Sequence, residues 1–119
     1  MNNKINITEA NISEENLFLK VESLSATLMP RGQMLVDSDH FAFIYILENE
    51  DAYTYLALPE WSWPTLKTAN EKGVKVFAIA GEANIELTQF NDELSYLIEN
   101  IKGNSNYGDE MVKKVEDLF

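Results

Sequence analysis

Two neighbouring segments with alternating apolar side chains constrain this chain more than any other feature. In residues 41–48, aromatic residues and a leucine take the odd positions, while alanine and isoleucines take the even positions. This is the two-residue period of a β-strand. Residues 53–58 repeat the alternation after the polar sequence Asn49-Glu50-Asp51. The pattern predicts two adjacent antiparallel strands, and since both of their faces are apolar, we expect them inside a sheet and not at its edge.

The length of the connecting turn decides which side chains of the two strands share a face. A three-residue turn at residues 49–51 sets Tyr45 opposite Tyr55, with Asn49 or Asp51 in the left-handed conformation. A two-residue turn at Asn49-Glu50 would slip the pairing by one and set the tyrosines opposite isoleucines. We predict the three-residue turn. One face of the pair then carries the aromatic residues Phe41, Phe43, Tyr45, Tyr53 and Tyr55.

Further segments show the same alternation. Residues 34–36 precede a polar turn and predict a third strand beside the first two. Residues 4–9 and 16–22 carry short alternations and predict an opening hairpin. Residues 74–79 and 83–87 predict another strand pair, which we expect to extend the sheet.

Apolar residues recur at helical spacing in three later segments, 63–69, 90–101 and 107–119. Ser62 is the expected N-cap of the first helix, and Gly73 is the expected residue that ends it in the left-handed conformation. The second and third helices are joined by a short polar segment. We therefore expect them to form a C-terminal helical hairpin.

The buried stripes of this helical hairpin need an apolar floor. We expect that floor to be the sheet face that carries Ile44, Ile46, Leu56 and Leu58. The chain has 119 residues, the usual size of one domain, and no linker-like run divides it. The predicted fold is a single α+β domain over residues 1–119. It contains an antiparallel sheet of about five to seven strands and three helices, with the C-terminal helical hairpin packing on one face.

Acidic residues dominate the charged residues of the chain, since 20 acidic and 9 basic side chains give a net charge of −11. This charge opposes the phosphate neutralisation that nucleic-acid binding requires, and it disfavours anionic membrane surfaces. We therefore expect neither nucleic acid nor a membrane as a partner. Cysteine is missing from the sequence, which excludes disulfides and thiolate chemistry. No run approaches the ~18 apolar residues of a membrane span, so we expect a cytoplasmic protein.

Three stretches carry a resemblance to a known family. They are Gly32-Gln33-Met34-Leu35-Val36-Asp37-Ser38-Asp39, Tyr53-Thr54-Tyr55-Leu56 with Pro59, and residues 97–108, which end in Gly103-Asn104-Ser105-Asn106-Tyr107-Gly108. With them the chain resembles the YjbL-like family of small uncharacterised proteins from bacilli and their relatives, over nearly its whole length. The segment at 103–108 is the most specific part. The resemblance implies a cytoplasmic bacterial protein of unassigned activity and supplies no catalytic residues.

Acidic residues gather at 37–39 and at 48–51, as they would around a hard metal ion. These clusters lie at opposite ends of one strand, more than about 25 Å apart at about 3.3 Å per residue, so their carboxylates cannot converge. His40 is the only histidine, and Ser38 and Asp39 are too close to it in the sequence to complete a catalytic triad. We predict no catalytic residue, no metal site and no cofactor.

The aromatic face of the central strands is the candidate binding site, because the helices are expected on the opposite face. If the N-terminal hairpin folds over the aromatic face, its residues belong to the core. If the face stays open, an apolar patch of this kind marks a partner or ligand surface. The candidate binding residues are Phe41, Phe43, Tyr45, Tyr53, Tyr55 and Trp61.

Two functions compete on these observations. The first is a non-enzymatic protein–protein interaction module, either a homodimer or a small adaptor. The alternative is a small-molecule binding or catalytic domain with a pocket under the aromatic face, where tyrosines form hydrogen-bonding walls and acids act as general bases. A protein that mimics nucleic acid would need its acidic residues in ordered rows, which the sequence does not show. We predict the interaction module, since the sequence contains no convergent catalytic set.

Overall fold

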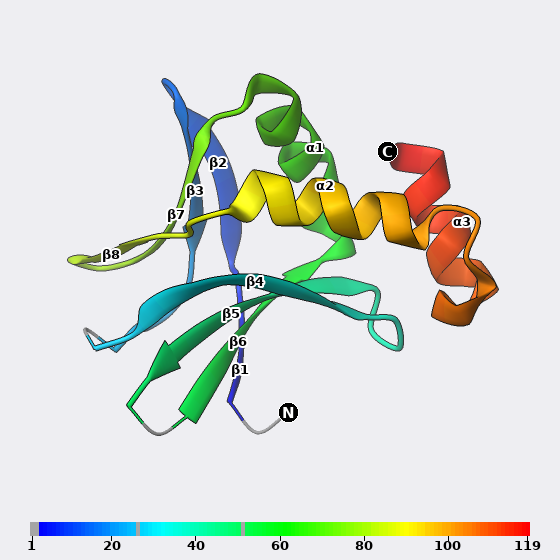
Figure 1. The fold of residues 1–119 in the computed structure, drawn as a ribbon. Coiled ribbons are helices and arrows are strands. Elements are labelled where there is room, and N and C mark those ends of the chain that lie inside the picture. The colour runs from blue at the N-terminus through cyan, green and yellow to red at the C-terminus, as the bar shows by residue number, and fades with distance from the viewer. Residues whose placement is uncertain (1–2, 26, 51) are drawn as a thin grey trace.

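The alternating segments form the centre of the first of two sheets. β5 (Ala42–Asn49) and β6 (Ala52–Pro59) pair antiparallel, β4 (Met29–Asp37) pairs with β5, and β1 (Lys4–Asn6) pairs with β6. The strand order is β1-β6-β5-β4, so the predicted central pair is internal (Figure 1). The computed structural model describes residues 3–25, 27–50 and 52–119.

The second sheet combines N-terminal strands with strands from the middle of the chain. It contains β2 (Glu9–Ser13), β3 (Asn16–Lys20), β7 (Lys75–Ala80) and β8 (Ala83–Glu86), in the order β2-β3-β7-β8. β3 runs parallel to β7, and β1 runs parallel to β6 in the first sheet. Both sheets are therefore mixed.

The prediction of a single antiparallel sheet is wrong, and the error begins at the N-terminus. Residues 4–9 and 16–22 do not form one hairpin, because β1 joins the first sheet and the chain then crosses to the second. There β2 pairs with β3 around Glu14, which has a positive φ of 56°. Alternation shows that a segment is extended, but it does not specify the partner strand. That choice depends on which apolar faces meet once the chain is folded.

The observed helices agree closely with the helical segments predicted from the sequence. Within the described residues the chain forms three α-helices, α1 (Trp63–Lys72), α2 (Phe90–Ile101) and α3 (Asp109–Leu118), and the short 3₁₀ turns η1 (Glu60–Ser62) and η2 (Ser105–Tyr107). Ser62 stands at the N-cap position of α1, where its hydroxyl donates a hydrogen bond to the Pro59 carbonyl (2.6 Å). Gly73 ends α1 in the left-handed conformation, with φ 66°. Both residues stand at their predicted positions, but the Ser62 side chain accepts no capping hydrogen bond from the first turn of α1.

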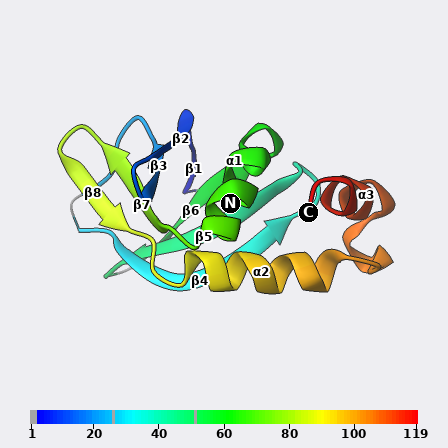
Figure 2. The same cartoon turned by 90° about the horizontal axis from the view of Figure 1, so that it is seen from above.

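The main core lies on one side of the first sheet. The second sheet, α1 and α2 all lie over this same side (Figure 1, Figure 2). Phe43 stacks on Trp63 with 4.7 Å between ring centroids, and Phe119 packs against both rings. The core also contains Leu17, Leu19, Met34, Tyr45, Leu47, Leu56, Leu58, Leu66, Val76, Phe90, Leu94, Ile101, Met111 and Val115.

The register of β5 and β6 differs from the predicted one. Asn49 pairs with Ala52, which leaves two residues between them, and Tyr45 lies opposite Leu56 instead of Tyr55. The predicted turn at residues 49–51 is therefore wrong, although its last residue, Asp51, lies outside the described residues. As a consequence, the floor beneath the helices includes Leu56 and Leu58 as predicted. Ile44 and Ile46, the other two residues assigned to that floor, point to the opposite side.

Candidate functional site

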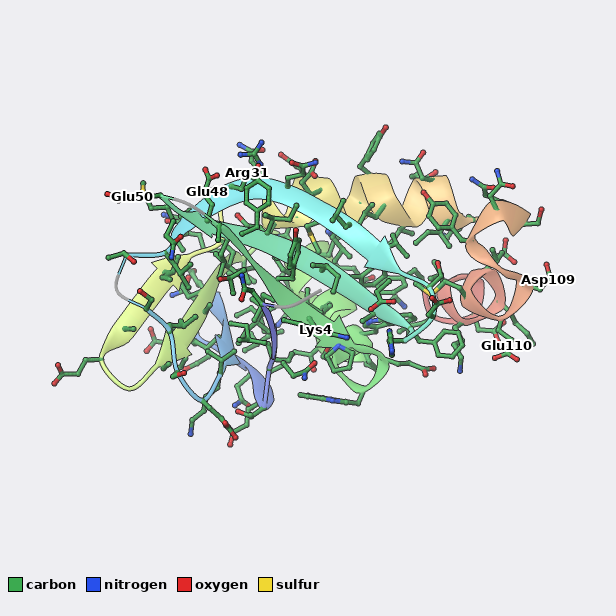
Figure 3. The ribbon with its side chains drawn as sticks, turned by 90° about the horizontal axis from the view of Figure 1, so that it is seen from below. Lys4, Arg31, Glu48, Glu50, Asp109 and Glu110 are labelled. Carbon is green, nitrogen blue, oxygen red and sulfur yellow. The ribbon has the colours of Figure 1, made fainter. Side chains whose placement is uncertain are left out.

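The side of the first sheet that points away from the second sheet, α1 and α2 is the candidate site, and we call it the outer face. Figure 3 views the molecule from this side, with the strands of the first sheet in front of α2. The strand register places on it Lys4, Asn6, Leu35, Asp37, Ala42, Ile44, Ile46, Glu48, Tyr53, Tyr55 and Ala57. Among the residues that the structure describes, no helix or further strand packs on this face.

The predicted aromatic residues are divided between the two sides of the sheet. Tyr53 and Tyr55 lie on the outer face, with their rings edge to face at 6.4 Å. Phe43 and Tyr45 are fully buried in the core on the other side. The prediction that these four residues share one face is therefore wrong. For Phe43 and Tyr45 the alternative of a core position is the correct one, and Leu17 and its neighbours from the N-terminal strands belong to the same core cluster.

Phe41 and Trp61 lie near α3. The Phe41 ring is half-buried and lies 5.0 Å below the ammonium group of Lys114. Trp61 is 56% exposed in η1, next to Glu60, whose carboxylate accepts a hydrogen bond from Lys114 at 3.1 Å. The structure thus groups Phe41 with α3 and the core, and it leaves Trp61 as an exposed aromatic residue beside that group.

The centre of the outer face is apolar. Ile44 and Ile46 are buried there, yet they do not belong to the main core cluster. Lys4 contributes to their cover: its ammonium group lies 3.5 Å from the Asp37 carboxylate, although β6 and β5 separate the strands of these two residues. The aliphatic part of Lys4 therefore crosses the sheet, as long cationic side chains do over apolar surface. Leu35 remains 40% exposed beside this centre.

One end of the outer face carries a compact ionic group. The His40 imidazole Nδ1 lies 3.0 Å from Asp37 Oδ2, and the backbone N–H of His40 donates to Asp37 Oδ1 at 3.3 Å. Burial opposes ionisation of Asp37, but the hydrogen bond and charge of His40 and the charge of Lys4 outweigh it, so the pKa of Asp37 is lowered. Asp37 is thus held as an anion between two basic side chains, one of which, His40, is largely exposed.

The opposite end carries a second ionic group, formed by Arg31 with Glu48 and Tyr53. The Arg31 guanidinium donates to the Glu48 carboxylate at 3.1 Å and lies 5.1 Å from the centre of the Tyr53 ring. The exposed Met29 pairs with Glu48 in the strand register and lies at the same end. Arg31, Glu48 and Glu50 mark this end in Figure 3.

A β-bulge in β4 positions Arg31, and it is the feature that the sequence analysis missed. The pairing of β4 with β5 shifts between Pro30 and Met34, and Gly32 adopts φ 70° there. On the core side, the Gly32 N–H donates to the Tyr45 hydroxyl (3.2 Å), which itself donates to the Thr88 carbonyl (2.6 Å). Burial raises the pKa of the Tyr45 hydroxyl. A glycine inside an otherwise extended segment was the signal for this bulge.

The two cations of the outer face, Lys4 and Arg31, are both paired with carboxylates. Lys4 pairs with Asp37, and Arg31 pairs with Glu48. The net charge of −11 is therefore carried by other positions. Charged residues are depleted at the core of protein–protein interfaces, and the central residues of the outer face, Ile44 and Ile46, are apolar.

A hollow of about 690 Å³ adjoins the Arg31 end of the outer face. Its lining residues are Thr27, Met29, Glu48, Asn49 and Glu50. The pocket that the alternative function requires would lie under the aromatic face, but the side chains of Phe43 and Tyr45 fill the core at that place. Metal-binding groups give no further candidate, since the described residues contain no cluster of three or more His, Asp or Glu side chains suited to a metal ion.

Comparison with known proteins shows the family. The model of UPF0738, described as a family of unknown function, matches residues 5–119. A UPF0738 protein of Bacillus licheniformis is 49% identical over 100% of this chain and 99% of its own length. The UPF0738 protein YjbL of Bacillus subtilis is 48% identical over the same shares. A relative from Geobacillus kaustophilus is 49% identical over 79% of this chain and 75% of its own length.

The chain belongs to the UPF0738 family, which confirms the resemblance inferred from its motifs. No solved structure matches it. Of the helices in the described part of the chain, none has the length and apolar character needed to cross a membrane.

Proposed function

We propose that this UPF0738 protein is a non-enzymatic protein–protein interaction module of the bacterial cytoplasm, with the outer face as its docking surface. The observation that carries the proposal is an apolar sheet face on which no helix or strand of the described chain packs. Leu35 and Tyr53 are about two-fifths exposed there, beside the buried pair Ile44 and Ile46. Exposed apolar side chains that gather on one face of a soluble protein favour an interaction site there.

The side chains at the Arg31 end suit an interface as well. Tyrosine and arginine are enriched among the residues that dominate binding energy. The Tyr53 ring is held between Tyr55 on one side and the Arg31 guanidinium on another. Because these contacts already restrict the ring in the free protein, docking costs less side-chain entropy than it would for a mobile tyrosine.

The ionic group at the other end does not resemble a catalytic site. Asp37 and His40 are hydrogen-bonded, but they belong to one tight turn, and the imidazole is 69% exposed. A general base acts on a substrate held within hydrogen-bond reach, and such substrates are usually bound in a concave pocket. An exposed imidazole on a turn supplies none. We therefore propose that Asp37 and His40 have a structural role: they stabilise this end of the sheet, and Asp37 holds the Lys4 side chain across the outer face.

Photo-cross-linking in a Bacillus host tests the proposal. A photoreactive phenylalanine analogue replaces Tyr53, and in the control it replaces Tyr96, a tyrosine of α2 that is 65% exposed. We expect discrete cross-linked protein species from position 53 and only background from position 96. Equal yields from both positions, or no species from position 53, would show that the outer face is not a docking surface.

A second candidate function rests on the hollow beside Met29. Its volume of about 690 Å³ lies within the usual range for small-molecule sites, and Glu48 and Glu50 favour a cationic ligand. Titration with a diamine, followed by NMR, discriminates the two functions. Saturable shifts confined to Met29, Glu48 and Asn49, together with background-only cross-linking at position 53, would favour the small-molecule function.

A further inference from the structure

Side chains alone close the apolar centre of the outer face. Ile44 and Ala57 are 0% and 1% exposed, and they lie opposite each other on β5 and β6. Neither residue belongs to the main core cluster, and among the described residues no helix or strand lies over them. We propose that the Lys4 side chain, anchored by Asp37, is a strap that closes this centre in the free protein and moves away when a partner docks. This inference rests on the proposed docking function and adds a means of regulating it.

The strand register places the two ends of the strap on opposite sides of the Ile44–Ala57 pair. Lys4 pairs with β6 two residues before Ala57, and Asp37 pairs with β5 two residues before Ile44. The ion pair between Lys4 Nζ and Asp37 Oδ2, at 3.5 Å, therefore spans the face diagonally across this pair (Figure 3). A lysine stem packs against apolar side chains while its ammonium group stays in water, and the Lys4 side chain is 26% exposed.

The anchor of the strap is weak, so the strap can open. An ion pair that water reaches contributes little to stability. When the Lys4 ammonium group leaves, Asp37 keeps the hydrogen bond from the His40 N–H at 3.3 Å and the contact with the His40 imidazole Nδ1 at 3.0 Å. Opening therefore does not leave a largely buried carboxylate without a partner, which is the costly outcome when an ion pair is broken.

The cation at the other end of the outer face is held more firmly. Arg31 donates to Glu48 at 3.1 Å and to Gln33 at 3.3 Å, and its guanidinium lies 5.1 Å from the centre of the Tyr53 ring. Moving Arg31 breaks all three contacts, whereas moving Lys4 breaks a single ion pair. Lys4 is therefore the side chain that can uncover the outer face at the lower cost.

A single cysteine reports whether the centre is open. The chain contains no cysteine, so Ala57→Cys supplies a unique thiol, and its rate of alkylation by iodoacetamide follows the population of the open form. We expect Lys4→Ala to raise this rate at least about tenfold, because it removes both the stem and the charge. Asp37→Asn should raise it about two- to fivefold, because it removes only the anchor. Lys113→Ala, which breaks an ion pair on α3, should leave the rate unchanged.

A second cysteine distinguishes opening of the strap from unfolding of the chain. Ala78 on β7 is fully buried in the main core, so a thiol introduced by Ala78→Cys reacts only when the chain unfolds. If the strap opens locally, the rate at position 57 exceeds that at position 78 by at least about tenfold in every variant. Equal rates at the two positions overturn the strap. So does a rate at position 57 that Lys4→Ala or Asp37→Asn raises no more than Lys113→Ala does.

Photo-cross-linking from position 53 relates the strap to docking. Lys4→Ala should raise the yield of cross-linked species severalfold, because the partner no longer has to displace the strap. A yield that Lys4→Ala leaves unchanged overturns the inference, while the docking function stands. If position 53 gives only background both in the parent and in Lys4→Ala, the docking function is overturned and the inference with it.

Discussion

At the scale of single residues, the contribution of the Asp37 carboxylate to stability can be tested directly. Its pKa is lowered in the folded protein, so the ionised carboxylate stabilises the fold above its unfolded pKa of about 3.9. That contribution disappears as the pH falls through the folded pKa. We expect Asp37→Asn to lower the free energy of unfolding by about 1–2 kcal/mol at neutral pH and by less at pH 3, which lies below the unfolded pKa. Urea unfolding at the two pH values measures the difference.

Asp39→Asn is the matched control, since Asp39 is an exposed carboxylate two residues away. It should change stability by less than about 0.5 kcal/mol at either pH. The same loss for Asp37→Asn at both pH values would contradict the assigned role of its charge.

The sequence correctly predicted which residues lie in the central strands, but it did not predict which side of the sheet each of them faces. Tyr45 was assigned to the correct strand, but the register was wrong because a turn without glycine is compatible with several lengths. Each change of one residue exchanges the faces. The composition of β6 contained the missing signal. Leu56 and Leu58 have no polar atoms in their side chains, so they suit the core, whereas the hydroxyls of Tyr53 and Tyr55 are easier to satisfy near solvent.

At the scale of elements, α2 is the helix on which packing against the first sheet depends. Its stripe is buried, and Leu94 is fully buried beside β4, where Glu93 accepts a hydrogen bond from the Met34 N–H at 3.0 Å. We expect Leu94→Ala to lower the free energy of unfolding by about 2–5 kcal/mol through lost burial and the remaining cavity. Tyr96→Ala on the exposed side should change it far less. Similar losses for both variants in urea unfolding would contradict this packing.

The elements themselves could largely be predicted, whereas their partners could not. The three helices are confirmed because the period of 3.6 residues acts within short segments; in α1 a proline in the first turn and a glycine at the end also mark its bounds. The strands at 74–79 and 83–87 are confirmed for the same reason. By contrast, β1 and β3 pair parallel with strands far along the chain. Such pairs depend on the packing of distant faces, which short-range patterns do not record.

At the scale of the whole molecule, the arrangement of layers creates the candidate site. The second sheet and two helices cover one side of the first sheet, and the described chain places no element on the other (Figure 2, Figure 3). As predicted, no helix of the described chain lies on one face of the central strands, but the side chains on that face are not the predicted ones. The outer face that results is apolar at its centre and has a group of paired charges at each end.

Hydroxyl-radical footprinting tests the central claim, that the outer face docks a protein, most directly. The radical oxidises exposed Met, Tyr and Leu side chains, so Met29, Leu35 and Tyr53 report on the face and Tyr96 serves as the internal control. The rates are compared between dilute purified protein and the same protein inside cells. We predict that oxidation of Leu35 and Tyr53 falls severalfold in cells relative to Tyr96. Unchanged relative rates at Leu35 and Tyr53 would contradict the claim.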